Sequence, residues 1–193
     1  MRPHFRNFLP KLVALALAVG LSGCSAATEP APPTSTPSPT TAVAPVFAND
    51  DEALAAAIEA YAAYQEMFTA VAAEGAINPE RMQAVTSGSY EDLMLQDLSD
   101  ARAAGLRTTG TTTFDGVMLQ RVDESAPSGT SVVVLYLCSD VSQVDVLDAN
   151  DVSQVDADRI PRTALEVGFD WEQGRPGVLT VGSRVAWTGD GVC

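Results

Sequence analysis

The sequence predicts an α+β domain in which N-terminal helices pack on a curved antiparallel sheet. Between residue 50 and about residue 104, apolar side chains recur at helical spacing. After Gly105 they recur with the period of two that is typical of strands, and short turn sequences separate the strand-like runs. Helices followed by such an antiparallel meander indicate a layout in which the helices cover one face of the sheet.

The first predicted helix begins after Asn49, an N-cap residue that has Glu52 at the capping-box spacing. We expect it to end before Gly75, which suits the position that follows a helix C-terminus. One side of this helix is apolar apart from Gln65, and Ala57, Tyr64 and Val71 flank it. The residues on that side are Leu54, Ile58, Tyr61, Gln65, Phe68 and Ala72.

Two more helices are predicted before the sheet. Asn78-Pro79 predicts a cap followed by proline at the first helical position, and the short helix should run to about Thr86. Ser89 and Asp92 form a second capping-box pattern. They predict a helix over 90–104.

The first part of the sheet contains an ambiguity. Residues 108–114 and 117–122 are rich in strand-forming side chains, and Asp115-Gly116 lies between them. This dipeptide is either a tight hairpin turn or a bulge within one long strand.

Three further strands follow. An apolar run covers 131–141, residues 163–171 alternate, and a turn is expected at Gly174-Arg175-Pro176-Gly177. The last strand is marked by Leu179, Val181, Val185 and Trp187.

Residues 1–23 have the layout of a secretory signal. Three basic residues precede an apolar run over 12–21, which is too short to span a bilayer. The run ends in Leu21-Ser22-Gly23-Cys24, which resembles the cleavage site of a bacterial lipoprotein, with Cys24 as the lipidated residue. This resemblance implies at least two acyl chains on the cysteine, and stable anchoring requires more than one. An ordinary cleaved signal with an incidental cysteine is the alternative.

Residues 24–47 are rich in Pro, Thr and Ser, a composition that cannot bury enough apolar surface to fold. We interpret them as a spacer that separates the membrane from a domain over 48–193. An O-glycosylated stalk is the alternative.

The formal net charge is −14, and cleavage of the signal would remove three basic residues and no acid. This charge argues against nucleic acid as a partner, because nucleic-acid binding needs basic patches. It also argues against electrostatic adhesion to anionic lipid. We therefore expect contact with the membrane through the lipid anchor alone, with the domain outside the cell on the outer face of the cytoplasmic membrane.

If Cys24 is lipidated, Cys138 and Cys193 remain. An exported domain with two cysteines favours a disulfide, which would hold the C-terminus in place. In the chain-entropy model, closing this loop stabilises the fold by about 4 kcal/mol. A redox-active thiol pair is the alternative, but the sequence has no Cys-x-x-Cys motif and no neighbouring lysine or histidine that would lower a thiol pKa.

The chain resembles the small NTF2-like (cystatin-like fold) lipoproteins of actinobacteria. The resemblance depends on the lipoprotein motif, the spacing from Gly105 to Gly110, Cys138-Ser139-Asp140, Trp171 and the terminal Gly191-Val192-Cys193. It implies a cone-shaped pocket between sheet and helices, and it favours the long bulged strand over the hairpin. It names a fold more than an activity.

The stretch from Asp140 to Asp158 is acidic, and oxygen ligands of this kind suit calcium. The candidate ligands are Asp145, Asp148, Asn150 and Asp151. The stretch lacks the glycine and glutamate of the helix-loop-helix calcium loop, so we favour a solvated hairpin tip with its turn at residues 147–150 and no metal.

Catalytic signals are sparse. The only histidine is His4, so histidine-based triads and zinc sites are excluded from the mature chain. In enzymes of the NTF2-like superfamily an aspartate base and a tyrosine meet in the cone, and the corresponding candidates are Tyr61, Tyr64 and Asp140. A pocket aspartate with a raised pKa could abstract a proton, but the family's acid–base motif is not legible at these positions.

These observations favour a lipoprotein with a non-catalytic binding or accessory domain that needs no cofactor and takes an unidentified protein or small molecule. The alternative is a lyase or isomerase acting on a small apolar substrate in the cone. A roomy pocket holding an ionisable group favours a ligand carrier or an enzyme. A cone filled by Tyr61, Phe68, Phe169 and Trp171 favours a protein-interaction module. A homodimer through the sheet face is a third hypothesis.

The lipid anchor is tested by Cys24→Ala. We expect this variant to leave the membrane fraction, because it has no residue to carry the acyl chains. Fractionation with detection of the chain measures the effect, with the wild type as control. A variant that stays with the membrane contradicts the prediction.

Overall fold

The structure is a computed structural model that describes residues 45–127 and 129–193. The predicted signal over 1–23, Cys24 and the linker up to residue 44 lie outside the described residues. The elements in chain order are α1 (Asp50–Ala73), the 3-10 helix η1 (Pro79–Ala84), α2 (Gly88–Ala103), β1 (Arg107–Thr109), β2 (Thr113–Val122), β3 (Val133–Asp140), β4 (Asp145–Leu147), β5 (Arg162–Glu172) and β6 (Arg175–Ala186).

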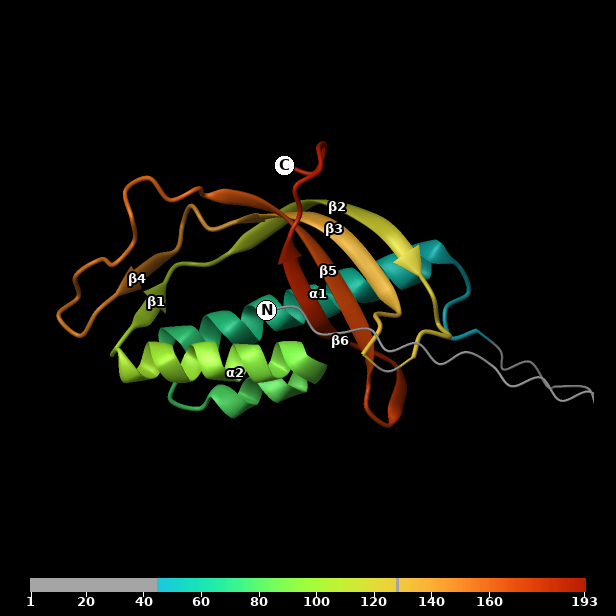
Figure 1. Ribbon diagram of the computed structural model, residues 1–193, viewed down its shortest axis with the longest axis horizontal. Helices are drawn as coiled ribbons and strands as arrows, with labels where there is room; N and C mark the ends of the chain where they lie inside the picture. The colour runs from blue at the N-terminus through green and yellow to red at the C-terminus, as the bar shows by residue number, and fades with distance from the viewer. Residues whose placement is uncertain (1–44, 128) are drawn as a thin grey trace, which may run out of the picture. The chain divides into compact units, whose positions relative to one another are not determined.

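The α+β prediction is confirmed. Four strands form an antiparallel sheet in the order β2-β3-β5-β6, and β1 pairs with β4 in a separate two-stranded sheet. Figure 1 shows α1 and α2 together on one side of the larger sheet. We call the sheet face under these helices the inner face and the opposite one the outer face. Among the described residues, no helix has the length and apolar character needed to cross a bilayer.

The start of α1 is confirmed. The Oδ1 atom of Asn49 accepts a hydrogen bond from the Glu52 amide at 3.0 Å, and the Glu52 carboxylate accepts from the Ala48 amide at 2.7 Å. The buried side of the helix includes Ala53 and Ala57, whereas Leu54 and Ile58 are only half-buried. Small side chains therefore face the sheet, which allows the helix to lie close to it.

The predicted capping box at Ser89 is wrong. Helix α2 begins at Gly88 with Ser87 as N-cap residue, two residues earlier than expected. The cause is a tertiary contact: the Val181 amide donates to the carbonyl of Val85, and the Ser87 amide donates to the carbonyl of Val181, both at 3.0 Å. This pairing holds the chain extended along β6 up to Ser87. The preceding helix is confirmed in position but is a 3-10 helix, and the Asn78 side chain makes no capping hydrogen bond.

The chain over 113–122 is one strand, so the hairpin alternative is wrong and the bulge is confirmed. The pairing of β2 with β3 shifts between Asp115 and Met118, which lie opposite Cys138 and Tyr136. Gly116, within the shift, has a φ of 62°, and a Cβ atom there would lie 2.6 Å from the Val192 carbonyl oxygen. Glycine therefore permits both the bulge and the close passage of the C-terminal tail.

The predicted disulfide is confirmed between Cys138 and Cys193, whose Cα atoms are 5.0 Å apart. The C-terminal tail, residues 187–193, lies over the outer face of the sheet. Trp187 packs on Tyr136 with ring centroids 4.4 Å apart, and Val192 is buried. The disulfide therefore fixes the tail on the sheet and covers part of β3.

The domain begins before residue 48, where the sequence placed the end of the linker. Phe47 is buried and stacks on Trp171, with ring centroids 5.3 Å apart. The Glu124 carboxylate accepts hydrogen bonds from the amides of Val46 and Phe47 at 2.6 and 2.8 Å. An aromatic side chain next to a proline-rich segment thus belongs to the core.

The turn between β5 and β6 is tighter than predicted. The strands are joined by Gln173-Gly174, and Arg175 already pairs with Glu172. Only the first residue of the expected turn at 174–177 lies in it, because the remaining three continue as strand.

Replacing Cys193 with Ser should lower the free energy of unfolding by up to about 4 kcal/mol, because the unfolded chain regains the entropy of a 55-residue loop. Urea unfolding followed by tryptophan fluorescence measures the change. Wild-type protein treated with a reductant is the control and should unfold at the same midpoint as the variant. Equal midpoints for oxidised wild type and variant would contradict the stabilising role.

Candidate functional site

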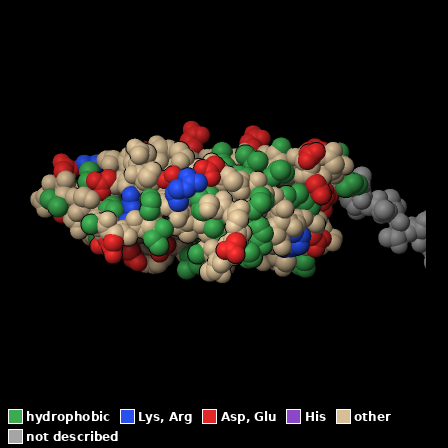
Figure 2. All heavy atoms as spheres, turned by 90° about the horizontal axis from the view of Figure 1, so that it is seen from above, with side chains coloured by type: hydrophobic (Ala, Val, Ile, Leu, Met, Phe, Trp, Pro, Cys, Tyr) green, Lys and Arg blue, Asp and Glu red, His purple; other side chains and the backbone are tan. Residues whose placement is uncertain are grey.

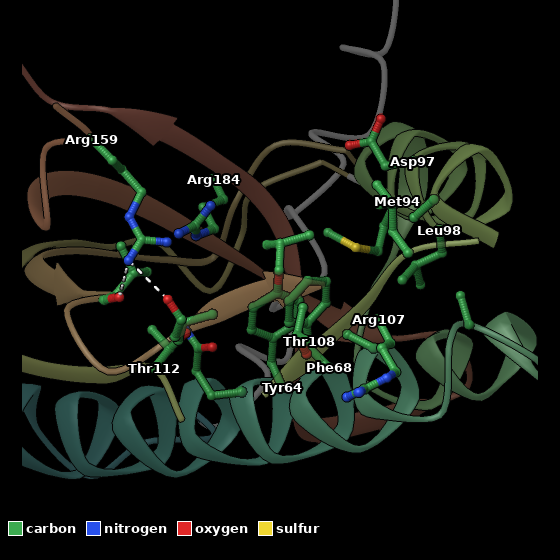
Figure 3. A pocket seen from close by; sticks show the side chains of 18 residues that line it. Tyr64, Phe68, Met94, Asp97, Leu98, Arg107, Thr108, Thr112, Arg159 and Arg184 are labelled. Carbon is green, nitrogen blue, oxygen red and sulfur yellow. Dashed lines mark hydrogen bonds between the residues drawn. The ribbon is translucent and has the colours of Figure 1, made fainter. Parts of the chain in front are cut away.

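The strongest candidate site is a cavity of about 500 Å³ between the helices and the sheet. Its walls come from α1, α2, the β1–β4 sheet, the loop after β3 and one residue of β6. Figure 3 shows the lining side chains converging from these elements. The volume falls in the range of roughly 300–1,000 Å³ that is typical of small-molecule sites.

Most of the wall is apolar. Helix α1 contributes Phe68 and Ala72, and α2 contributes Met94 and Leu98. The neighbouring core is densely filled, since Tyr61 and Phe169 are fully buried. Of the four residues that would fill a closed cone, Tyr61 and Phe169 do so and Trp171 stacks on Phe47, but Phe68 borders the open cavity.

One wall belongs to a long acidic arm, defined here as residues 141–161. Val141, Val144 and Val146 from this arm line the cavity. Arg159 ties the arm to itself, because one Nη2 atom donates to the carbonyl oxygens of Val141 and Val144 at 2.9 and 2.8 Å. The arm is thus held as a fixed wall by an arginine at its base.

The predicted turn at the tip of the arm is confirmed. The Oδ1 atom of Asp148 accepts from the amides of Asn150 and Val152 at 2.8 and 3.0 Å. The Asp151 amide also donates to the Asp148 carbonyl at 3.0 Å. A side chain that bonds its own backbone two residues on is a common way of closing such turns.

The carboxylates proposed as calcium ligands have protein partners. Asp145 accepts from the hydroxyl of Ser153 at 2.6 Å, and Asp151 forms an ion pair with Arg107. Asp148 is used in the turn just described, and Asn150 donates to it through its backbone. In the part of the chain that the structure describes, no group of three or more His, Cys, Asp or Glu side chains could hold a metal ion.

Arg184 enters the cavity from the sheet because of a bulge in β6. Val181 pairs with Phe169, but Arg184 pairs with Val167, so Gly182 and Ser183 lie opposite the single residue Gly168. Directly paired residues point to the same face of a sheet. Phe169 and Val167 both belong to the core, so Arg184 points inward, three residues after Val181.

Gly182 makes this bulge fit. A Cβ atom at residue 182 would lie 2.1 Å from Oδ2 of Asp170. That carboxylate accepts a hydrogen bond from the Ser87 hydroxyl at 3.1 Å, which links it to the start of α2. A larger residue at 182 would displace Asp170 or abolish the bulge that turns Arg184 inward.

The guanidinium of Arg184 lies among tyrosines. Its Nε atom donates to the Tyr61 hydroxyl at 3.5 Å, and that hydroxyl also accepts from Nε2 of Gln65 at 2.8 Å. Burial by itself lowers the pKa of Arg184, but the oxygens of Tyr61 and Tyr64 outweigh this effect and leave the pKa above its ordinary value. Arg184 therefore carries its charge at every physiological pH.

Tyr64 and Tyr90 share a hydrogen bond of 2.7 Å between their hydroxyl oxygens. Burial raises the pKa of Tyr64 far above its usual range, and burial also raises that of Tyr90. Both hydroxyls are therefore protonated at neutral pH and can donate hydrogen bonds.

Asp140 does not join Tyr61 and Tyr64. It accepts from the Ser142 amide at 2.8 Å and pairs with Arg162 at 2.9 Å. The hydrogen bonds from Ser142 and then Arg162 lower the pKa of Asp140, which is the opposite of what a pocket base requires. The structure thus brings the two tyrosines to the inner face and leaves the third catalytic candidate in an ion pair.

Arg184 is the site residue that the sequence analysis missed. Val181 and Val185, which mark the last strand in the sequence, would lie on one face under strict alternation, yet Val181 is buried and 54% of Val185 is exposed. The available signal was Gly182, because a glycine inside a strand pattern often marks a bulge.

No family model and no curated protein matches this chain. One solved structure that is similar to it is the crystal structure of the intermembrane space region of the chloroplast protein ARC6. The TM-score is 0.48 and the identity 12%, over 69% of this chain and 95% of that chain. A likeness of this size carries no argument about the site.

Replacing Arg184 with Met should raise the free energy of unfolding by about 1 kcal/mol at pH 7. The substitution removes a charge that has lost part of its hydration and keeps an apolar stem of similar length. Urea unfolding measures this change. Arg107→Met is the control, because the ion pair of Arg107 is exposed and its loss should change the free energy of unfolding by less than about 0.5 kcal/mol. A clear loss of stability in the Arg184 variant would show that the arginine serves the fold instead.

Proposed function

We propose that this chain is an extracellular lipoprotein, held to the outer face of the cytoplasmic membrane through Cys24, whose domain binds a small apolar ligand without transforming it. The domain is proposed to be an NTF2-like cone, with the ligand in the cavity between the two helices, the β1–β4 sheet and Arg184 of β6. The helices on one face and the bulged β2 strand support this finer fold.

The observation that carries the proposal is the cavity. Its walls combine apolar side chains such as Phe68, Met94 and Leu98 with a few polar groups, as small-molecule sites do. A region used only for core packing would be filled by its own apolar side chains, whereas here they border a space of about 500 Å³.

A binding role is supported over a lyase or isomerase by the groups that line the cavity. Among the described lining residues, Asp97 is the one carboxylate, and it is an exposed residue of α2. Tyr64 is held in its protonated form by burial, which makes it a poor base. We therefore place the enzyme hypothesis second.

The homodimer through the sheet face stays a prediction. On the outer face, the C-terminal tail already covers part of β3. Met118 and Val185 remain exposed at 42% and 54% on β2 and β6, and these side chains would have to supply the apolar part of such an interface.

A fluorescent, uncharged apolar probe tests the cavity directly. We expect the purified full chain to bind N-phenylnaphthylamine with a rise in fluorescence, and Ala101→Trp to abolish the rise by filling the cavity from α2. The experiment uses the Cys24→Ala background, so that no acyl chain of the protein competes with the probe.

Ala103→Trp is the matched control, because Ala103 lies on the same helix but is exposed. It should bind the probe as the parent chain does. Both variants should unfold at about the same urea concentration as the parent chain, which shows that they are folded. If the parent chain does not bind the probe, or if Ala101→Trp binds it equally well, the proposed function is wrong.

A further inference from the structure

Three arginines line the cavity, and among the described residues Arg184 is the one with neither a carboxylate nor a backbone carbonyl as partner. Arg107 pairs with Asp151, and Arg159 donates to two carbonyl oxygens of the arm. Within residues 45–127 and 129–193, Arg184 forms no ion pair, and its one hydrogen bond is the long contact from Nε to Tyr61. Among the described residues, the two Nη atoms of Arg184 therefore have no acceptor, although the side chain lines a cavity with mostly apolar walls.

This arrangement is unusual for so acidic a protein. The chain has 25 acidic residues, and every described arginine other than Arg184 has a carboxylate or a backbone carbonyl as partner. Figure 2 shows the same pattern on one face, where the few basic side chains lie beside acidic ones. A partly buried charge without a partner lowers the stability of the fold, so its presence here indicates a binding role.

We propose that the ligand of this cavity is an amphiphile with a single anionic head group, and that Arg184 binds this head group while the apolar walls enclose the tail. The inference rests on the proposed function and adds the chemical class of the ligand. A carboxylate or a phosphate monoester would supply the acceptor oxygens that the Nη donors lack.

The groups around Arg184 suit an anion. The Tyr64 and Tyr90 hydroxyls share one hydrogen bond, so with Tyr90 as its donor the hydrogen of Tyr64, which lines the cavity, is available to an acceptor. Asp97 is the one acid among the described lining residues, and it does not neutralise Arg184 by an ion pair. Phe68, Met94 and Leu98 form an apolar wall that would receive a hydrocarbon tail.

The test compares three ligands that share one tail: decanoate, decyl phosphate and decanol. Each competes with N-phenylnaphthylamine for the full chain in the Cys24→Ala background. We expect at least one of the two anions to displace the probe at about tenfold lower concentration than decanol, because a hydrogen bond to a charged group contributes at least that factor. The order of the two anions shows whether the site prefers a carboxylate or a phosphate.

Arg184→Gln should abolish the advantage of the anions over decanol measured in the same variant, while the probe and decanol still bind. Retained binding of these two neutral molecules shows that the variant still folds around its cavity. Arg107→Gln is the matched control, since it removes another lining arginine and should keep the advantage. Arg184→Lys should keep part of it, because lysine preserves the charge but not the planar donor pair.

The outcomes separate the two proposals. Absence of probe binding in the parent chain overturns the proposed function. Binding of probe and decanol with no advantage for either anion overturns only the assignment of Arg184, and so does an advantage that survives in Arg184→Gln. The comparison of the three ligands in the parent chain does not depend on any Arg184 variant folding.

Discussion

The apolar inner face of β3 and β5 must be covered, and most of the structure follows from how that is done. Val133, Leu135 and Val167 are fully buried under the helices. Helix α1 presents alanines where it lies close to the sheet and tyrosines where more space must be filled. Toward the β1–β4 sheet the acidic arm completes the enclosure instead of a helix, and there the cavity remains.

The outer face is governed by the tail. The disulfide between Cys138 and Cys193 and the packing of Trp187 on Tyr136 hold residues 187–193 across the sheet. The bulge at Gly116 lets the Val192 carbonyl approach β2 closely. The two faces therefore differ. The outer face is partly covered by the tail, which the disulfide fixes, and the inner face lies on the side of the site for which we propose an anionic amphiphile.

A second bulge gives the site its charge. In a regular strand, residues 181, 183 and 185 would share a face, and Arg184 would lie in water on the other one. The extra residue at Gly182 reverses this order beyond Val181. A single shift of register thus puts Arg184 instead of Val185 on the inner face, in the wall of the cavity. The tyrosines of α1 and α2 lie near this arginine.

The sequence by itself determined the features that depend on near neighbours: the cap at Asn49, the helix end at Gly75, the bulge alternatives at Gly116 and the turn at Asp148. Periodicity also gave the α+β class, because burial of one face imposes it residue by residue. The tertiary structure alone decided that Ser87 starts α2, that Phe47 belongs to the core and that Arg184 points inward. Each of these depends on pairing or packing with a segment distant in the chain, and the energy of such a contact is not encoded in the residues around it.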